Sequence, residues 1–181
     1  MLGKRAYSSW ELGAIGERLV ACELDRLVSL GRGWAYLNSI PVGANDSDID
    51  HLVIGPGGVF TLNAKHHPRG RVWVGGNTVI VNGTRHPYVR NSRFEAQRAS
   101  RLLSAATGIG VTVQGLVVPV GASSFTVKQQ PEAVHVVNRS RLVQYLASRE
   151  PVLNAAAVAH ILGYARLGST WRAAGSRTPS R

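Results

Sequence analysis

The sequence predicts an α/β domain built around a mixed sheet. Three observations predict it: an amphipathic helical pattern near the start, several short β-branched runs separated by glycine turns, and a continuous apolar run after a second helical pattern. At 181 residues, the chain is long enough for one domain with its own hydrophobic core. We therefore expect helix, strands, helix and strand in that order, followed by closing helices.

Apolar spacing, β-branched runs and glycine or proline breaks set the expected elements. Gly55–Gly58 lies between two apolar runs and predicts a β-hairpin in which Ile54 pairs with Val59. Ser92 precedes Glu95 by three residues, a capping-box spacing that predicts the start of the second helix. The expected elements are a helix over 11–30, a strand over 34–42, paired strands over 48–54 and 59–65, paired strands over 71–74 and 78–81, a helix over 92–105, a strand over 111–120, a loop over 123–132, a strand over 133–137, and helices over 140–149 and 152–167.

This hairpin register places four polar side chains on one face, because side chains alternate along a strand. Asp50 lies opposite Asn63, and Asp48 lies opposite Lys65. Residues directly opposite each other have Cβ atoms about 4.5–5.5 Å apart. Carboxylate, amide and ammonium groups therefore converge on a patch the size of one metal ion and one phosphate.

Each of these groups suits the hydrolysis of a phosphodiester bond. Mg²⁺ takes oxygen ligands and keeps several waters, so one or two carboxylates suffice to bind it. The cation lowers the pKa of a bound water and neutralises charge on the phosphate. Lys65 is one of three lysines against eighteen arginines, so its compact charge is not the default basic choice in this chain. The alternative interpretation is a surface hairpin with an ordinary cross-strand Asp–Lys pair.

The charge balance favours a polyanionic partner. Twenty-one Lys and Arg against ten Asp and Glu give a net charge of +11, and nucleic acid is the first candidate. Arg93, Gln97 and Arg101 follow at spacings of four and form a candidate phosphate-contacting stripe on the second helix. His67 lies on the same face as Lys65 if that strand continues. The alternatives are a solvated basic helix face and an arginine-rich composition with no nucleic-acid partner.

Several other classes of protein lack support. A single cysteine, Cys22, excludes an internal disulfide, and the helical pattern around it predicts a buried thiol. No HExxH or second cysteine supports a zinc site, and no phosphate-binding loop or Gly-x-Ser-x-Gly elbow is present. No apolar run is long enough to cross a bilayer, and the start lacks the apolar core of a signal peptide. We expect a cytoplasmic protein with no membrane partner.

Short motifs follow one another over residues 13–120. They are Gly16-Glu17-Arg18, Asp48-Ile-Asp50-His51, Gly57-Gly-Val-Phe60, Asn63-Ala-Lys65 and Gln97. In this order they resemble the nuclease-related domain (NERD) family, which is assigned to the PD-(D/E)XK nuclease-like superfamily. The resemblance implies a restriction-endonuclease-like α-β-β-β-α-β core with a mixed sheet and extra C-terminal helices.

The resemblance also implies an active site. Its catalytic residues would be Glu17, Asp50, Asn63, Lys65 and Gln97, of which Glu17, Asp50 and Asn63 would bind Mg²⁺ or Mn²⁺. Asn63 departs from the family pattern, which has Glu or Gln at this position. Asparagine offers a carbonyl oxygen to a metal ion, but it carries no charge and is one methylene shorter.

Two acidic residues of the first expected helix are candidates for this site. On a helical wheel, Glu17 lies just beyond the edge of the apolar face, whereas Glu23 lies nearer its centre. The order of the family motifs selects Glu17, and Glu23 stays the rival carboxylate. Gly13 and Gly16 would let this helix approach another backbone closely.

We therefore expect a metal-dependent nuclease or DNA-processing protein that hydrolyses phosphodiester bonds. Asn63 leaves a second function open, a non-catalytic nucleic-acid-binding protein on a degenerate nuclease fold, so whether the chain is an enzyme is undecided. A third alternative is a scaffold that recruits proteins through its apolar surface. The expected partner is nucleic acid, DNA rather than RNA, with a homo-oligomer as an open alternative. The expected nucleic-acid contacts are Arg93, Arg101, Lys65 and His67.

The sequence divides into four segments. We expect an N-terminal arm over 1–10, a nuclease-related core over 11–120, and a C-terminal strand and helices over 121–167 that complete the same domain. The remaining segment, 168–181, is rich in Gly, Ser, Thr and Arg and is expected to be a disordered basic tail.

Overall fold

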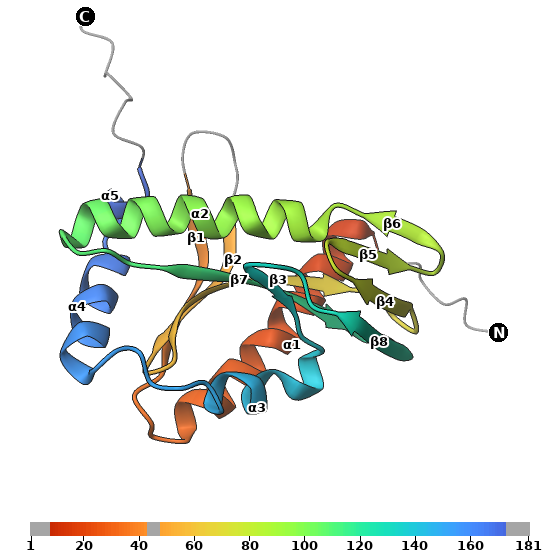
Figure 1. The fold of residues 1–181 in the computed structure, drawn as a ribbon, viewed down its shortest axis with the longest axis horizontal. Coiled ribbons are helices and arrows are strands. Elements are labelled where there is room, and N and C mark those ends of the chain that lie inside the picture. The colour runs from red at the N-terminus through yellow and green to blue at the C-terminus, as the bar shows by residue number, and fades with distance from the viewer. Residues whose placement is uncertain (1–7, 43–47, 173–181) are drawn as a thin grey trace, which may run out of the picture.

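The computed structural model of the chain describes residues 8–42 and 48–172. Its elements are α1 (Ser9–Ser29), β1 (Ala35–Pro41), β2 (Asp48–Gly55), β3 (Gly58–His66), β4 (Arg71–Gly75), β5 (Thr78–Val81), β6 (Thr84–His86), α2 (Tyr88–Thr107), β7 (Val113–Val120), β8 (Ser124–Gln129), β9 (Val134–Val136), the 3₁₀ helix η1 (Arg139–Arg141), α3 (Leu142–Ala147), α4 (Ala155–Ala165) and α5 (Gly168–Trp171). Figure 1 shows α2 along one side of the strands and α1 with α3 on the other.

A capping box starts α1. The Glu11 backbone amide donates to Ser8 Oγ at 3.2 Å, and the Ser8 amide donates to the Glu11 carboxylate at 2.8 Å. These two bonds satisfy amides that the first helical turn leaves unpaired. Further along, Val20, Leu24 and Leu27 form the stripe that packs on the sheet. The helix thus begins before residue 11, the expected start.

The main sheet has the strand order β1-β2-β3-β7-β9. β1, β2 and β3 are antiparallel neighbours, and β7 and β9 continue the sheet in parallel, so the sheet is mixed as predicted. Ile54 pairs with Val59, which confirms the predicted hairpin register. β7 comes from the continuous apolar run and is buried along nearly its whole length.

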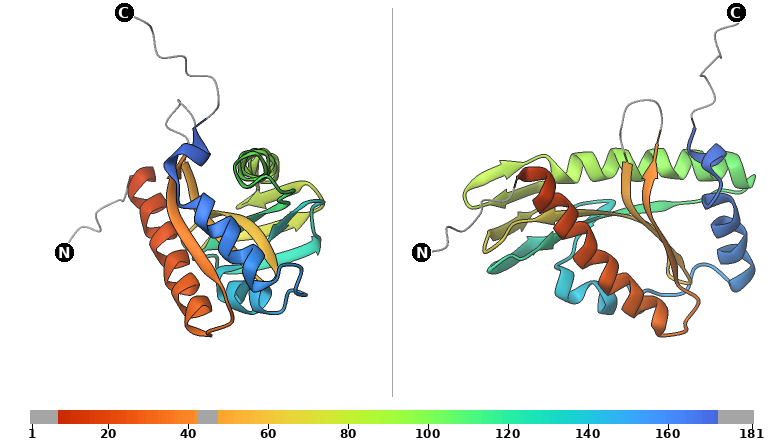
Figure 2. Two further views of the ribbon diagram at one scale, coloured as in Figure 1. Left: turned by 90° about the vertical axis from the view of Figure 1, so that its left-hand side faces the viewer. Right: turned by 180° about the vertical axis from the view of Figure 1, so that it is seen from behind.

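Helices cover both faces of this sheet. α1 and α3 pack on one face through a cluster that includes Leu24, Phe60 and Leu146. α2 and α4 pack on the other face through a cluster that includes Leu103 and Ile161. The end-on view in Figure 2 shows α1 and α2 on opposite sides of the strands. A side chain on the strands between these helices therefore faces either α1 or α2.

A second sheet, with the order β6-β5-β4-β8, packs beside the start of α2. Its strands β4 to β6 are inserted between β3 and α2, and β8 returns after β7 to pair with β4 in parallel. The loop expected over 123–132 is therefore wrong, because most of it forms β8. The residues of β8 are exposed or half-buried, so the segment lacks the run of apolar residues that predicts a strand.

Three further expectations are wrong. The second helix begins at Tyr88 after Pro87, not at Ser92, which is buried inside it. The tail does not begin at 168, since Trp171 of α5 is only 3% exposed and donates from Nε1 to the Ala165 carbonyl. Residues 173–181 lie outside the described part of the chain. Cys22 is exposed rather than buried.

The order α1, β1, β2, β3, α2, β7 is the expected α-β-β-β-α-β core, with one three-stranded insertion before α2. The mixed sheets and the C-terminal helices α3 to α5 agree with the restriction-endonuclease-like fold class. In the part of the chain that the structure describes, no helix is both long and apolar enough to cross a membrane.

Candidate active site

β2 and β3 separate at the open end of their hairpin. Their ladder runs from the turn to the pair His51–Leu62 and stops there. Beyond that pair, Asp50 Oδ2 accepts a hydrogen bond from the backbone amide of Ala64 at 2.9 Å. A carboxylate thus satisfies a backbone amide that a regular ladder would pair with a carbonyl group.

The two cross-strand pairs predicted beyond this point are corrected accordingly. Asp50 with Asn63, and Asp48 with Lys65, are not ladder pairs in the structure. β3 instead continues beside β7 as far as His66. Asp50 still lies beside Asn63 and Lys65, because its carboxylate bonds with the amide of Ala64 between them, and Asp48 is near enough to raise the pKa of Asp50.

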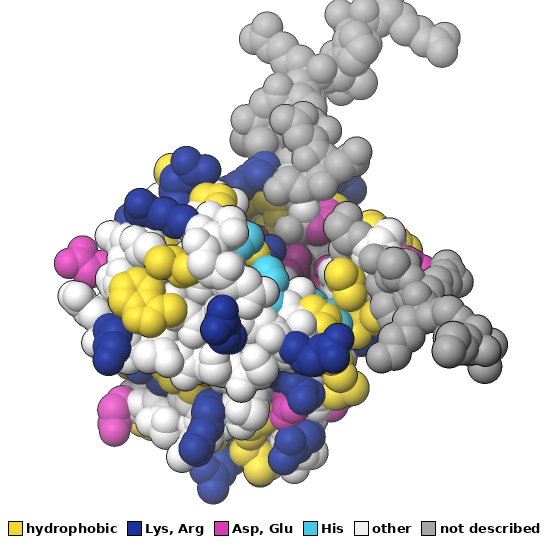
Figure 3. Space-filling view, turned by 90° about the vertical axis from the view of Figure 1, so that its right-hand side faces the viewer, with side chains coloured by type: hydrophobic (Ala, Val, Ile, Leu, Met, Phe, Trp, Pro, Cys, Tyr) yellow, Lys and Arg dark blue, Asp and Glu magenta, His cyan; other side chains and the backbone are white. Residues whose placement is uncertain are grey.

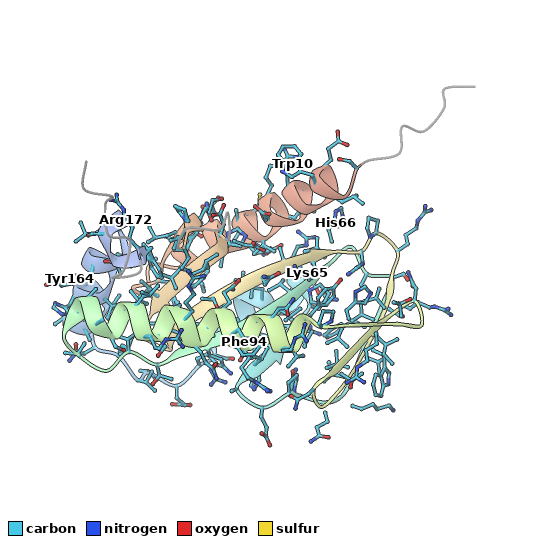
Figure 4. The ribbon with its side chains drawn as sticks, turned by 90° about the horizontal axis from the view of Figure 1, so that it is seen from above. Trp10, Lys65, His66, Phe94, Tyr164 and Arg172 are labelled. Atoms are coloured by element: carbon cyan, nitrogen blue, oxygen red, sulfur yellow. The ribbon has the colours of Figure 1, made fainter. Side chains whose placement is uncertain are left out.

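Asn63 and Lys65 lie on the face of β3 that is turned toward α2. Their neighbours Leu62 and Ala64 point the other way, into the cluster beneath α1. The Lys65 ammonium lies 5.4 Å from the ring centroid of Tyr88, at the start of α2. Such a cation–π contact favours one position of the lysine side chain. Figure 4 shows Lys65 between the ribbons of α1 and α2.

Glu95 on α2 also lies beside Asn63, and the sequence patterns did not identify this glutamate as a site residue. Asn63 Nδ2 donates a hydrogen bond to Glu95 Oε2 at 3.3 Å. Burial, and then the negative charge of Asp50, raise the pKa of Glu95 to about 7, although Asn63 and Lys65 oppose the shift. A carboxyl group with such a pKa is typical of functional sites.

Glu17 approaches from the other side of the sheet, on α1. A Cβ atom at Gly16 would lie 3.0 Å from the His66 Cβ, so this glycine lets α1 pack closely against the end of β3, as expected. Gly13 meets no such neighbour. Burial first, and then Asp50, raise the pKa of Glu17, whereas Lys65 lowers it.

The rival carboxylate, Glu23, has a structural role. It is buried and forms ion pairs with Arg26 at 2.8 Å and with Arg139 at 3.1 Å. The pair with Arg139 holds α1 against η1. Glu17 and Glu95, which come from opposite helices, are the glutamates that interact with Asp50 and Lys65.

The oxygen atoms of this cluster fit a divalent cation. Asn63 Oδ1, Glu95 Oε1 and Thr61 Oγ1 are buried and hydrogen-bond to no described residue. Hard divalent cations prefer such oxygen ligands. Among the described residues, no group of three His, Cys, Asp or Glu side chains forms a ready ligand set. The Asn63 amide oxygen and waters would therefore have to complete the coordination.

A cleft lies on each side of the cluster. The first, of about 430 Å³, runs between α1 and β1, and the second, of about 310 Å³, runs between β2 and α2. Each contains one of the two glutamates, one arginine and one exposed aromatic side chain. These are Trp10, Glu17 and Arg18 in the first cleft, and Phe94, Glu95 and Arg98 in the second. Trp10 is 80% exposed and Phe94 is 62% exposed.

The structure does not bring Gln97, Arg93 or Arg101 to this cluster. Residues two positions apart on a helix point about 200° apart, so Gln97 lies on the opposite flank of α2 from Glu95. Arg93 on that flank donates to Asn77 Oδ1 at 2.9 Å and so ties α2 to the second sheet. Gln97 and Arg101 are exposed.

His67 lies near Lys65 but belongs to an aromatic cluster. Its Nε2 forms a hydrogen bond of 2.9 Å with the hydroxyl of Tyr88, and His86 stacks on Tyr88 at 4.7 Å. Burial, followed by His86 and Lys65, lowers the pKa of His67. His66 points the other way and bonds with the Leu12 carbonyl. Figure 3 shows histidine and acidic side chains around a hollow at this end of the molecule.

Residues 12–120 match the model of a family described as nuclease-related domain, NERD. The match spans more than half of the chain and contains Glu17, Asp50, Asn63, Lys65 and Glu95. Membership of the PD-(D/E)XK superfamily is consistent with this family match. The mixed α/β fold of the chain agrees with the fold of that superfamily. Comparisons with curated proteins and with solved structures find no match.

Proposed function

This chain belongs to the nuclease-related domain family, and on that basis we propose that it is a metal-dependent enzyme that hydrolyses phosphodiester bonds in nucleic acid. One observation carries the proposal. Asp50 and Lys65 meet where β2 and β3 separate, and both interact with a glutamate from each of the helices α1 and α2.

The side chains divide into two roles. Asp50, Glu17 and the Asn63 carbonyl oxygen would hold Mg²⁺ or Mn²⁺. Bound there, the cation supplies a water of lowered pKa and neutralises charge that develops on the phosphate. Lys65 orients the attacking water and stabilises the negative charge of the transition state. The Tyr88 ring holds the Lys65 ammonium in place.

The two clefts suit a nucleic-acid strand. Arg18 and Arg98 stand at either side of the site, where each can contact a backbone phosphate. Trp10 and Phe94 are exposed aromatic rings on which unpaired bases stack favourably. The net charge of +11 adds affinity that does not depend on sequence. We propose DNA rather than RNA as the substrate.

Cleavage of supercoiled plasmid tests the proposal. Purified protein is incubated with Mg²⁺, Mn²⁺ or EDTA, beside Asp50→Asn and the exposed control Glu150→Gln. Asn at position 50 keeps an acceptor for the Ala64 amide but removes the charge. We expect nicking that requires a metal ion, disappears in Asp50→Asn and persists in Glu150→Gln. Cleavage that survives EDTA, or survives Asp50→Asn, contradicts the proposal.

Asn63 favours a second candidate function, a nucleic-acid-binding protein without catalysis. The uncharged side chain at this position weakens the hold on a metal ion. Under this alternative, the protein binds plasmid with a steep dependence on salt, does not cleave it with any metal ion, and binds equally well as Asp50→Asn.

A further inference from the structure

We propose that Glu95 is the acidic metal ligand of this site and supplies the negative charge that Asn63 lacks. This inference rests on the proposed function, because it concerns the same metal site. The strand would supply an amide oxygen, and α2 would supply the carboxylate that a nuclease of this kind otherwise carries on the strand.

The contact between the two side chains supports this division. The Asn63 Nδ2 group donates to Glu95 Oε2, which fixes the carboxylate against the strand. This bond leaves Glu95 Oε1 and Asn63 Oδ1, both of which are buried and bond to no described residue. Unpaired buried oxygens are rare in folded proteins, because each one loses its hydrogen bonds to water. Asn63 and Glu95 are hydrogen-bonded to each other, and each has one such unpaired oxygen. This arrangement indicates a position for a bound ligand.

Thr61 lies beside the same pair of side chains. Its side chain lies on the same face of β3 as Asn63, two residues along the strand. It is 0% exposed, and its hydroxyl also bonds to no described residue. It nevertheless lies near enough to Glu95 to lower the pKa of that carboxyl group, without a hydrogen bond of ordinary length and angle. Asn63, Glu95 and Thr61 therefore bring three buried oxygens together between β3 and α2.

A purely structural role for Glu95 fits the molecule less well. Glu23 shows how this chain stabilises a buried glutamate, with arginines at 2.8 and 3.1 Å. Glu95 forms no ion pair within 4.0 Å in the described part of the chain, and the like charge of Asp50 affects it more than the opposite charge of Lys65 does. A divalent cation between these carboxylates would remove their repulsion.

Binding of Mn²⁺ alone, without nucleic acid, tests the proposal. The full chain is titrated with Mn²⁺ and free Mn²⁺ is measured by electron paramagnetic resonance. The variants are Glu95→Gln, the double variant Asn63→Asp/Glu95→Gln, Asp50→Asn and the control Glu150→Gln. The double variant exchanges amide and carboxylate between the two positions and keeps the number of heavy atoms. Circular dichroism confirms that each variant is folded.

We expect Glu95→Gln to weaken Mn²⁺ binding by about tenfold or more. The double variant, which restores the charge count, should recover most of that loss, and Glu150→Gln should bind like the unmodified protein. Equal affinity of Glu95→Gln and the unmodified protein, with binding lost in Asp50→Asn, would overturn the role of Glu95 and leave the proposed function standing. Absence of binding in the unmodified protein would overturn both.

Discussion

Asp50 Oδ2 accepts a hydrogen bond from the Ala64 amide at 2.9 Å, so a side chain bridges β2 and β3 where their ladder ends. The bond fixes the carboxylate beside Asn63 and Lys65, and no arginine in residues 8–42 and 48–172 forms an ion pair with it. Asp50 therefore has a structural role beside its proposed role in metal binding, and substitutions can separate the two.

Asp50→Ala should lower the free energy of unfolding by about 1–3 kcal/mol, because the buried Ala64 amide loses its acceptor. Asp50→Asn should lower it much less, because its carbonyl oxygen can accept the same bond. Urea denaturation of both variants in EDTA measures the difference. Equal losses would show that the hydrogen bond does not hold the strands together.

Lys65→Met should reduce the rate of cleavage by about 10²–10³-fold, because it removes the positive charge beside the reacting phosphate. Methionine keeps the length and apolar stem of the lysine. The matched control is Lys128→Met on β8, where the lysine is exposed and lies on the second sheet. Initial nicking rates under saturating Mg²⁺ provide the comparison, and equal rates for the two variants would exclude the assigned role.

The stability of the metal-free protein should fall as pH rises from about 4.5 to about 7. The pKa of Glu95 is raised to about 7, so the folded state holds this proton more tightly than the unfolded state does. The free energy of unfolding is therefore greatest below the ordinary pKa of the carboxyl group and declines through the raised one. Each pKa unit corresponds to about 1.4 kcal/mol, so the rise from 4.5 to about 7 gives a decline of about 3 kcal/mol.

Glu95→Gln should remove most of this decline, because the amide does not titrate, and the raised pKa values of Glu17 and Asp50 account for the remainder. Urea denaturation in EDTA at several pH values between 4.5 and 8 measures both proteins. If their stabilities run parallel over this range, Glu95 does not have the raised pKa.

Arg98→Ala should weaken binding of a fluorescent single-stranded oligonucleotide. It should also reduce the slope of the logarithm of the binding constant against the logarithm of the salt concentration by about one, as expected for the loss of one phosphate contact. Arg98 lines the cleft that contains Glu95. The control is Arg101→Ala, three residues further along α2, where the arginine is exposed and does not line that cleft. Fluorescence anisotropy at several salt concentrations gives both slopes. A larger effect of Arg101→Ala would place the nucleic acid on the flank that the sequence alone suggested.

Local patterns predicted much of the fold and part of the site. Ile54 and Val59 flank a glycine turn, and the register of a hairpin follows from its turn. β7 was recognisable because a long apolar run is typical of a strand buried on both faces. Asp50, Asn63 and Lys65 came from the same register, and they lie together even though the ladder ends before them.

Tertiary packing decided the rest. Ser92 and Glu95 have the spacing of a capping box, but the helix begins earlier, and both side chains lie within it. Gln97 shares a flank with two arginines, yet only the contacts of α2 with the sheets show which flank meets the site. The one sequence signal for Glu95 was a lone acid in an otherwise basic helix.

The position of a bound metal ion tests the central claim most directly. Crystals of the protein are soaked in Mn²⁺, and anomalous scattering locates the ion. Metal-dependent hydrolysis at this site predicts a peak at coordination distance, about 2.2 Å, from the Asp50 carboxylate and close to Asn63 and Glu95. The same soak of Asp50→Asn crystals should show no such peak. Mn²⁺ bound only elsewhere, with none beside Asp50, would contradict the claim.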